Sequence, residues 1–116
     1  MALHLIKLCV GADSLEDLES WIARRVDLQR AAGQSANQFH VTRMQPKRAD
    51  ELLDGGSLYW VIKGNVQARQ KLVGIEPFTD NEGIARCRLV LDPVLVHTRW
   101  QPKRPFQGWR YLKDDD

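Results

Sequence analysis

The sequence predicts an α+β domain with one long N-terminal helix and a mixed, mainly antiparallel, barrel-like sheet. Apolar residues recur at helical spacing over residues 15–32, and short β-rich stretches separated by turn signals follow from residue 39 onward. The chain has 116 residues, 43% of them hydrophobic, which suits one globular domain with its own core. We assign this domain to residues 1–113 and an acidic tail to residues 114–116.

The first third of the chain predicts a strand and then the helix. Apolar and other residues alternate over residues 2–10, and Gly11 ends that pattern. The side chain of Asp13 or Ser14 can accept a hydrogen bond from an amide of the first helical turn. The acidic residue three positions later can accept one from the amide of the capping residue, as in a capping box. We expect a helix of about 18 residues, roughly 27 Å long, that ends near Ala32 with Gly33 as its cap. Its apolar stripe, which places Trp21 in the core, consists of Leu15, Leu18, Trp21 or Ile22, and Val26.

The remainder of the chain predicts strands. Aromatic and β-branched residues dominate several segments, and Gly, Pro, Asn and Asp interrupt them. A single helical turn is expected at residues 49–53. The predicted strands cover residues 39–44, 57–63, 69–78, 83–91, 94–100 and 109–112.

The net charge of +2 conceals an uneven distribution. Residues 1–38 carry a net charge of −1, residues 39–113 carry +6, and the tail carries −3. No apolar run approaches the length of a membrane span, and the N-terminus lacks the basic region of a signal peptide. Cys9 and Cys87 each lie among alternating apolar residues, as buried free thiols do. We therefore expect a cytoplasmic protein without a membrane partner.

A seven-residue segment occurs twice in the chain. Residues 42–48 read TRMQPKR and residues 98–104 read TRWQPKR, so six of seven positions are identical. Each copy follows a histidine near the end of a predicted strand, and its proline is expected to stop that strand. One interpretation is that both copies are solvated loops whose cations pair with acids such as Asp50 or Glu51. The other is that the two loops surround one anionic groove.

Aromatic residues accompany these cations in the basic part of the chain. Cations bind phosphates and aromatic faces stack on bases, with roughly 1 to 3 kcal/mol from each stacked base. Tyr59 and Trp60 are strand neighbours, so they point to opposite faces of the sheet. The predicted nucleic-acid site consists of Arg43, Lys47, Arg48, Trp60, Lys63, Arg69, Arg99, Trp100, Lys103 and Arg104.

Known catalytic and metal-binding motifs are absent from the sequence. The three histidines are isolated, and no zinc-type spacing, nucleophile elbow or phosphate-binding glycine loop occurs. His40 and His97 precede the two repeat copies and could meet across a cleft as acid and base. A lone strand histidine is more often structural, so we expect no catalytic residue, no metal and no cofactor, and a binding protein rather than an enzyme.

Three longer segments carry a family resemblance. GSLYWVIKGNVQARQ (residues 56–70), RCRLVLDP (86–93) and PFQGWRYL (105–112), with the opening LHLIKLCVG, resemble domain of unknown function number 1489. This family occurs chiefly in alphaproteobacteria, and the resemblance implies a small cytoplasmic protein without supplying an activity. The YWVIK segment and the QAR that follows are similar to PUA-like barrels, which implies that RNA or a modified nucleotide binds between barrel and helix.

Together these features predict that RNA or another nucleic acid binds a basic, tryptophan-containing cleft, with a modified base as one target class. The alternative is an enzyme or sensor for a nucleotide-like, phosphorylated small molecule, which would use the same cations with His40 and His97. A third class is a protein-interaction module, which would show an exposed apolar patch instead of a basic cleft.

Overall fold

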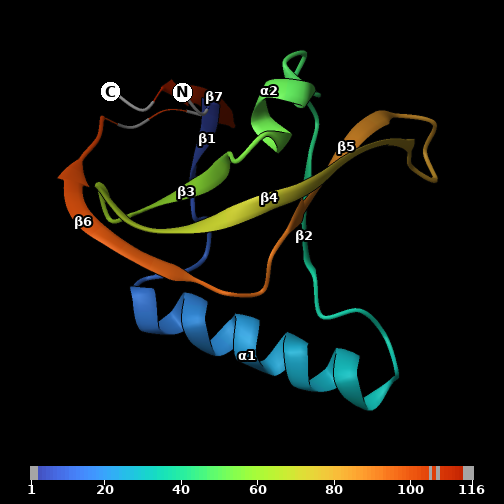
Figure 1. Ribbon diagram of the computed structural model, residues 1–116, viewed down its shortest axis with the longest axis horizontal. Coiled ribbons are helices and arrows are strands. Elements are labelled where there is room, and N and C mark those ends of the chain that lie inside the picture. The colour runs from blue at the N-terminus through green and yellow to red at the C-terminus, as the bar shows by residue number, and fades with distance from the viewer. Residues whose placement is uncertain (1–2, 105, 107, 114–116) are drawn as a thin grey trace.

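Seven strands and two helices make up the described part of the chain. The computed structural model describes residues 3–104, 106 and 108–113, and Figure 1 shows their arrangement. The predicted acidic tail lies outside the described residues. In chain order the elements are β1 (Leu3–Leu8), α1 (Leu15–Ala31), β2 (Gln38–Thr42), α2 (Ala49–Leu53), β3 (Ser57–Ile62), β4 (Asn65–Thr79), β5 (Ala85–Leu91), β6 (Val96–Pro102) and β7 (Trp109–Lys113).

The long strand β4 organises the sheet. The strand order is β2-β5-β4-β3-β1-β7, and β6 also pairs with β4. The first part of β4 lies between β3 and β6, whereas its second part pairs with β5. A register shift next to Gly74 marks the change, and a Cβ at this glycine would approach Val90 Cγ2 to 3.2 Å. β1 pairs with β3 in parallel, and the other pairings are antiparallel.

A two-residue turn joins β3 to β4. Lys63 has φ of +49° and Gly64 has φ of +81°, the left-handed pair that a tight hairpin requires. Glycine adopts a positive φ without strain, whereas a lysine adopts one only rarely. The turn lets β4 begin at Asn65, four residues before the strand that the sequence predicted.

The helix α1 begins and ends as the sequence predicted. Ser14 Oγ accepts a hydrogen bond from the Asp17 amide at 3.2 Å, and Asp17 Oδ2 accepts one from the Asp13 amide at 3.1 Å. This reciprocal capping box satisfies amides that the first turn leaves free. The helix spans 17 residues, and Gly33 follows it with φ of +71°.

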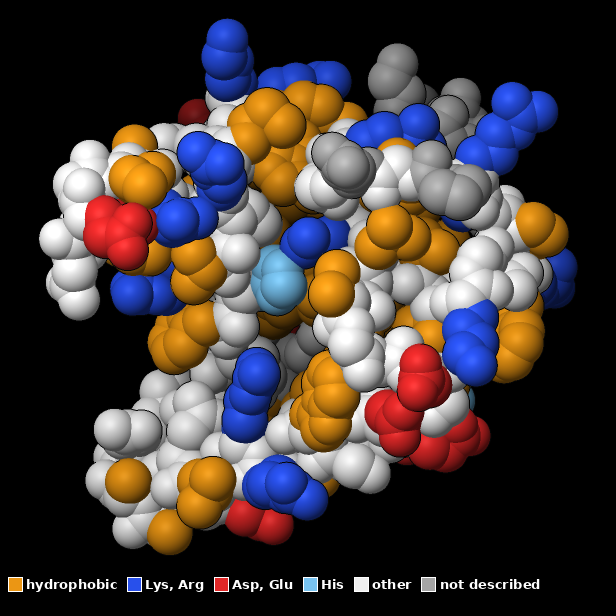
Figure 2. All heavy atoms as spheres, turned by 180° about the vertical axis from the view of Figure 1, so that it is seen from behind, with side chains coloured by type: hydrophobic (Ala, Val, Ile, Leu, Met, Phe, Trp, Pro, Cys, Tyr) orange, Lys and Arg blue, Asp and Glu red, His pale blue; other side chains and the backbone are white. Residues whose placement is uncertain are grey.

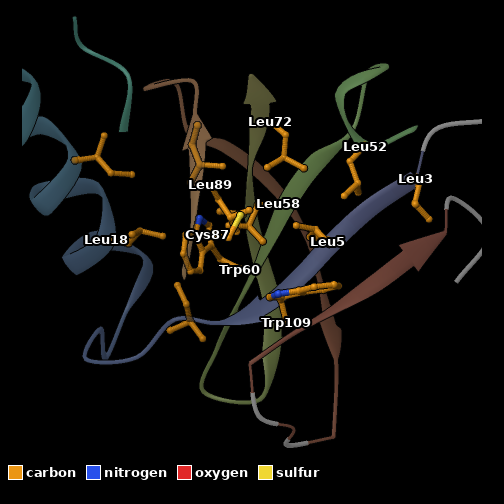
Figure 3. Close-up of a cluster of buried hydrophobic side chains, with 14 of the residues drawn as sticks. Leu3, Leu5, Leu18, Leu52, Leu58, Trp60, Leu72, Cys87, Leu89 and Trp109 are labelled. Carbon is orange, nitrogen blue, oxygen red and sulfur yellow. The ribbon is translucent and has the colours of Figure 1, made fainter. Parts of the chain in front are cut away.

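The sheet is covered on both faces. The larger buried cluster lies between the sheet and α1, and the helix contributes Leu15, Leu18 and Ile22 to this cluster. Figure 3 shows Leu18 pointing from the helix toward Trp60 and Cys87 on the strands. A smaller cluster covers the other face around Ile6, with Val61, Val66 and Leu112, and with Tyr59 and Phe106 packed against it.

The predicted fold class, a PUA-like barrel with one long N-terminal helix, is wrong. The sheet is mixed and open: β6 pairs only with β4 in the described residues, and β7 pairs only with β1. Strands predominate, and α1 lies between β1 and β2. The periodicity of each segment identified a strand or a helix, but the pairing of strands far apart in sequence depends on tertiary packing.

Candidate functional site

The first copy of the repeated segment packs against β7. The Lys47 and Arg48 amides donate hydrogen bonds to Tyr111 Oη at 3.0 and 3.2 Å, and Trp109 Nε1 donates to the Met44 carbonyl at 2.8 Å. Both aromatic side chains belong to the face of the sheet that carries the larger cluster. Arg48 forms an ion pair with Glu51, as the solvated-loop interpretation expects, whereas Arg43 and Lys47 are exposed.

The second copy has a different conformation. Its first five residues form part of the edge strand β6, which exposes Arg99 and leaves Trp100 64% exposed. The Lys103 amide then donates to the Gly64 carbonyl at 2.9 Å. Two residues beyond the exposed Arg104, Phe106 packs against the smaller cluster on the other face.

The two copies are therefore not equivalent in structure. Pro46 in the first copy is fully buried in an irregular loop, whereas Pro102 in the second is exposed at the end of an edge strand, a position that tolerates proline. The first copy contacts one face of the sheet, and the chain leaves the second copy toward the opposite face. These contacts do not bring the six cations of the repeat into one groove.

The other predicted site residues are dispersed. Lys63 and Trp100 line one hollow of about 180 Å³, which Asp13 and Glu16 also line. The two acids offset the charge of the lysine, so this hollow is a poor phosphate site. Arg69 Nη1 donates to Ser57 Oγ at 3.2 Å.

Of the ten predicted site residues, Trp60 alone lines a second pocket. The described lining of this pocket combines aromatic and cationic side chains and contains no acidic residue. This pocket lies between α1, the end of β1, and strands β2, β3 and β4, and has a volume of about 140 Å³. The face in Figure 2 is hollowed between the helix and the sheet, with basic and hydrophobic side chains around the hollow. Strand β2 contributes Gln38, Phe39 and His40, and α1 contributes Trp21 and Arg25.

Hydrogen bonds and ring contacts fix one wall of the pocket. The rings of His40 and Trp60 meet edge to face, with centroids 5.3 Å apart and planes at 82°. Trp60 Nε1 donates to Gln70 Oε1 at 2.9 Å, and Gln70 Nε2 donates to the Asp92 carbonyl at 2.9 Å. Trp60 is only 4% exposed, so its ring is held in a fixed orientation.

Two cations and a neutral histidine determine the electrostatics. Burial, reinforced by the charges of Lys7 and Arg25, lowers the pKa of His40 to about 4. Lys7 is the cross-strand partner of Trp60 and therefore points to the same face. Burial also raises the pKa of the Cys9 thiol, which keeps it protonated at neutral pH. The pocket thus carries positive charge and an uncharged imidazole.

Exposed apolar side chains surround the mouth. Val10 is 81% exposed, Phe39 47% and Trp21 38%, and all three line the pocket. Gly11 permits this arrangement, because it has φ of +92° and a Cβ there would lie 3.3 Å from Trp21 Cη2. The prediction that Trp21 belongs to the core is wrong, since Ile22 takes the buried place in the helix stripe. An apolar rim around a pocket is typical of a ligand site.

A family model described as "Protein of unknown function (DUF1489)" matches residues 5–116. The chain belongs to this family. No curated protein and no solved structure matches the DUF1489 chain. Among the described residues, no helix is long and apolar enough to cross a membrane.

The two histidines of this DUF1489 protein do not meet across a cleft. His40 lies in the pocket on one side of α1, whereas His97 lines a groove on the other side and bonds to Glu19 on that helix at 2.5 Å. No cluster of three potential metal ligands occurs in the described ranges. Neither observation identifies a reaction.

Sequence reasoning missed most residues of the pocket. Arg25, Gln38 and Gln70 carried no recognisable motif. Two features of the sequence could have indicated pocket residues. One is the polar residue Gln38 directly before a predicted strand, and the other is the cation Arg25, which lies one helical turn after Trp21. Neither signal becomes specific until the fold brings the segments together.

Proposed function

We propose that this protein binds RNA or another single-stranded nucleic acid and takes one base into the pocket between α1 and β2. The observation that carries the proposal is the pocket of about 140 Å³ with Trp60 and His40 on its wall. A cavity of about 150 Å³ can accept a benzene ring, so a single ring fits. Proteins hold unstacked bases through aromatic contacts and a few polar groups.

The charges support an anionic ligand. Lys7 and Arg25 both act electrostatically on His40, so two cations lie near the pocket while the imidazole itself is neutral. A phosphate attached to the bound base would be attracted by them. Trp21 at the mouth is partly exposed and offers a ring face for a neighbouring base.

The cations of the repeated segment form the outer part of this proposal. Lys47, Arg48 and Arg104 are exposed and Lys103 is half-buried, so they would contact phosphates of a longer strand outside the pocket. Such contacts add affinity without reading the base. A modified base is one target class for the same pocket.

The first experiment measures binding of labelled single-stranded RNA by fluorescence anisotropy. Arg25→Ala should weaken binding about tenfold and lower the slope of log affinity against log salt by about one. Arg24→Ala is the matched control, because it removes the same charge from the neighbouring exposed position outside the pocket. Absence of binding by the unaltered protein, or equal effects of the two variants, would overturn the proposal.

A second experiment separates the pocket from the repeat. The fourfold variant Lys47→Ala, Arg48→Ala, Lys103→Ala, Arg104→Ala should lower the affinity for long strands. The affinity for very short strands should stay nearly unchanged. Loss of all binding in this variant, with no effect of Arg25→Ala, would place the site at the repeat instead of the pocket.

The alternative function is an enzyme or sensor for a nucleotide-like phosphorylated small molecule. The volume of the pocket is also compatible with this function, because a cavity of this size accepts the single ring of a small ligand. Thermal-shift measurements distinguish the two functions: stabilisation by mononucleotides and not by oligonucleotides would indicate the small-molecule ligand.

A further inference from the structure

The amide of Gln38 has a single defined orientation. Gln29 Nε2 donates to the Asn37 carbonyl at 3.0 Å, which leaves Gln29 Oε1 to accept from Gln38 Nε2 at 2.9 Å. Gln38 Nε2 also donates to the Ala36 carbonyl at 2.8 Å. Backbone carbonyls can only accept, so this chain of bonds assigns nitrogen and oxygen in both side chains. The remaining atom, Gln38 Oε1, is a hydrogen-bond acceptor.

This acceptor is buried and unsatisfied. Gln38 is 3% exposed, and its Oε1 has no hydrogen-bond partner in the described part of the chain. A buried carbonyl without a donor destabilises the folded state, because it has given up its hydrogen bonds to water. Native proteins contain few such groups, and those that persist often belong to a functional site or meet a bound water or ion.

The acceptor belongs to a residue of the proposed base pocket. Gln38 and His40 both line the pocket, and they are two residues apart on β2, so they project to the same side of the strand. The side chain of His40 has no hydrogen bond to any described residue, and its neutral ring carries one N–H donor. The wall therefore combines an acceptor with a donor.

We propose that Gln38 Oε1 is the specificity-determining acceptor of the pocket and selects an amino-bearing single-ring base of the cytosine type. Cytosine presents a 4-amino donor beside the N3 acceptor, which complements Gln38 as acceptor and His40 as donor. A pocket of one-ring volume favours a pyrimidine over a purine. This inference rests on the proposed function, because it concerns which base enters the same pocket.

The test removes one donor from the ligand without adding bulk. The probe is a short single strand in which abasic spacers occupy every position except one, and that position carries either cytosine or 2-pyrimidinone, which lacks the 4-amino group. Affinity is measured by anisotropy. The unaltered protein should bind the cytosine strand about tenfold more tightly, as the loss of one hydrogen bond to a buried acceptor predicts.

Variants assign the discrimination to Gln38. Gln38→Leu, and Gln38→Asn as the more conservative change, should reduce the ratio of the two affinities to about one. Gln29→Met is the control, because it removes the neighbouring bond and leaves the Gln38 oxygen in place, so the ratio should persist. Circular dichroism establishes that each variant is folded, and the comparison of the two strands on the unaltered protein needs no variant.

The outcomes separate the two proposals. If the unaltered protein binds both strands equally, or if both folded Gln38 variants keep the ratio, the inference about Gln38 is overturned while base binding stands. If neither the cytosine strand nor any longer RNA binds, the proposed function itself fails.

Discussion

The imidazole of His40 meets the indole of Trp60 edge to face, with the centroids 5.3 Å apart. This contact joins strands β2 and β3, which are separated by two other strands in the sheet order. The open sheet must curve for the two rings to meet, and the pocket lies at this contact. The same burial that brings the rings together keeps the imidazole uncharged.

Stability should depend on pH through His40. Its pKa is about 4 in the folded protein against 6.5 when exposed, so the unfolded chain takes up a proton first as the pH falls. Stability is therefore unaffected above about pH 6.5 and decreases between pH 6.5 and 4. Compared with His40→Gln, the unaltered protein should lose about 2 to 3 kcal/mol of unfolding free energy over that window. Urea titrations check this, and parallel pH profiles for the two proteins would contradict it.

The hydroxyl of Tyr111 should stabilise the loop that contains the first repeat copy. It accepts hydrogen bonds from the Lys47 and Arg48 amides, and Tyr111→Phe removes this acceptor. We expect a loss of about 1 kcal/mol in urea unfolding, because water can partly replace the bonds at this exposed site. Tyr59→Phe, on the opposite face, is the control and should cost less than about 0.5 kcal/mol.

Two adjacent glycines should respond differently to alanine. A Cβ at Gly56 would lie 2.3 Å from the carbonyl oxygens of Leu3 and Leu52, so the backbone itself must move. Gly55 has free space around it but φ of +88°. We expect Gly56→Ala to cost more than about 3 kcal/mol or to prevent folding, and Gly55→Ala to cost about 1 to 2 kcal/mol. Thermal unfolding compares them; equal losses would show that the strand ends adjust easily.

The capping box of α1 should contribute measurably to stability. Ser14→Ala removes the acceptor for the Asp17 amide and should cost about 1 kcal/mol. Ser20→Ala, at an exposed position inside the helix, should be neutral or slightly stabilising, since alanine has the higher helix propensity. Denaturant unfolding of both variants provides the measurement, and an equal effect at the two serines would disprove the cap's role.

Local patterns predicted the local elements of this protein. The capping box, the helix over Leu15–Ala31 and the strand Ser57–Ile62 follow from periodicity and turn chemistry within short windows. The parallel pairing of β1 with β3 and the open edges of the sheet were not predictable in this way. Pairing depends on which distant strands pack together, and no single window contains that information.

The repeated segment illustrates the same limit for the site. The same six residues form an irregular loop with a buried proline in one place and an exposed edge strand in the other. The first copy is held by Tyr111 and Trp109, the second by pairing with β4. Neighbours supplied by the fold, and not the segment's own residues, decide its conformation.

By itself the sequence determined the helix, most of the strands and the uneven charge. Only the tertiary structure decided that Arg25, Gln38 and His40 share one pocket with Trp60. The physical reason is that helix and strand periodicity are short-range properties, whereas a pocket forms where side chains from distant segments leave space between them. The sequence could not show that the Gln38 oxygen lacks a donor, because this depends on the hydrogen bonds that its neighbours form in the folded protein.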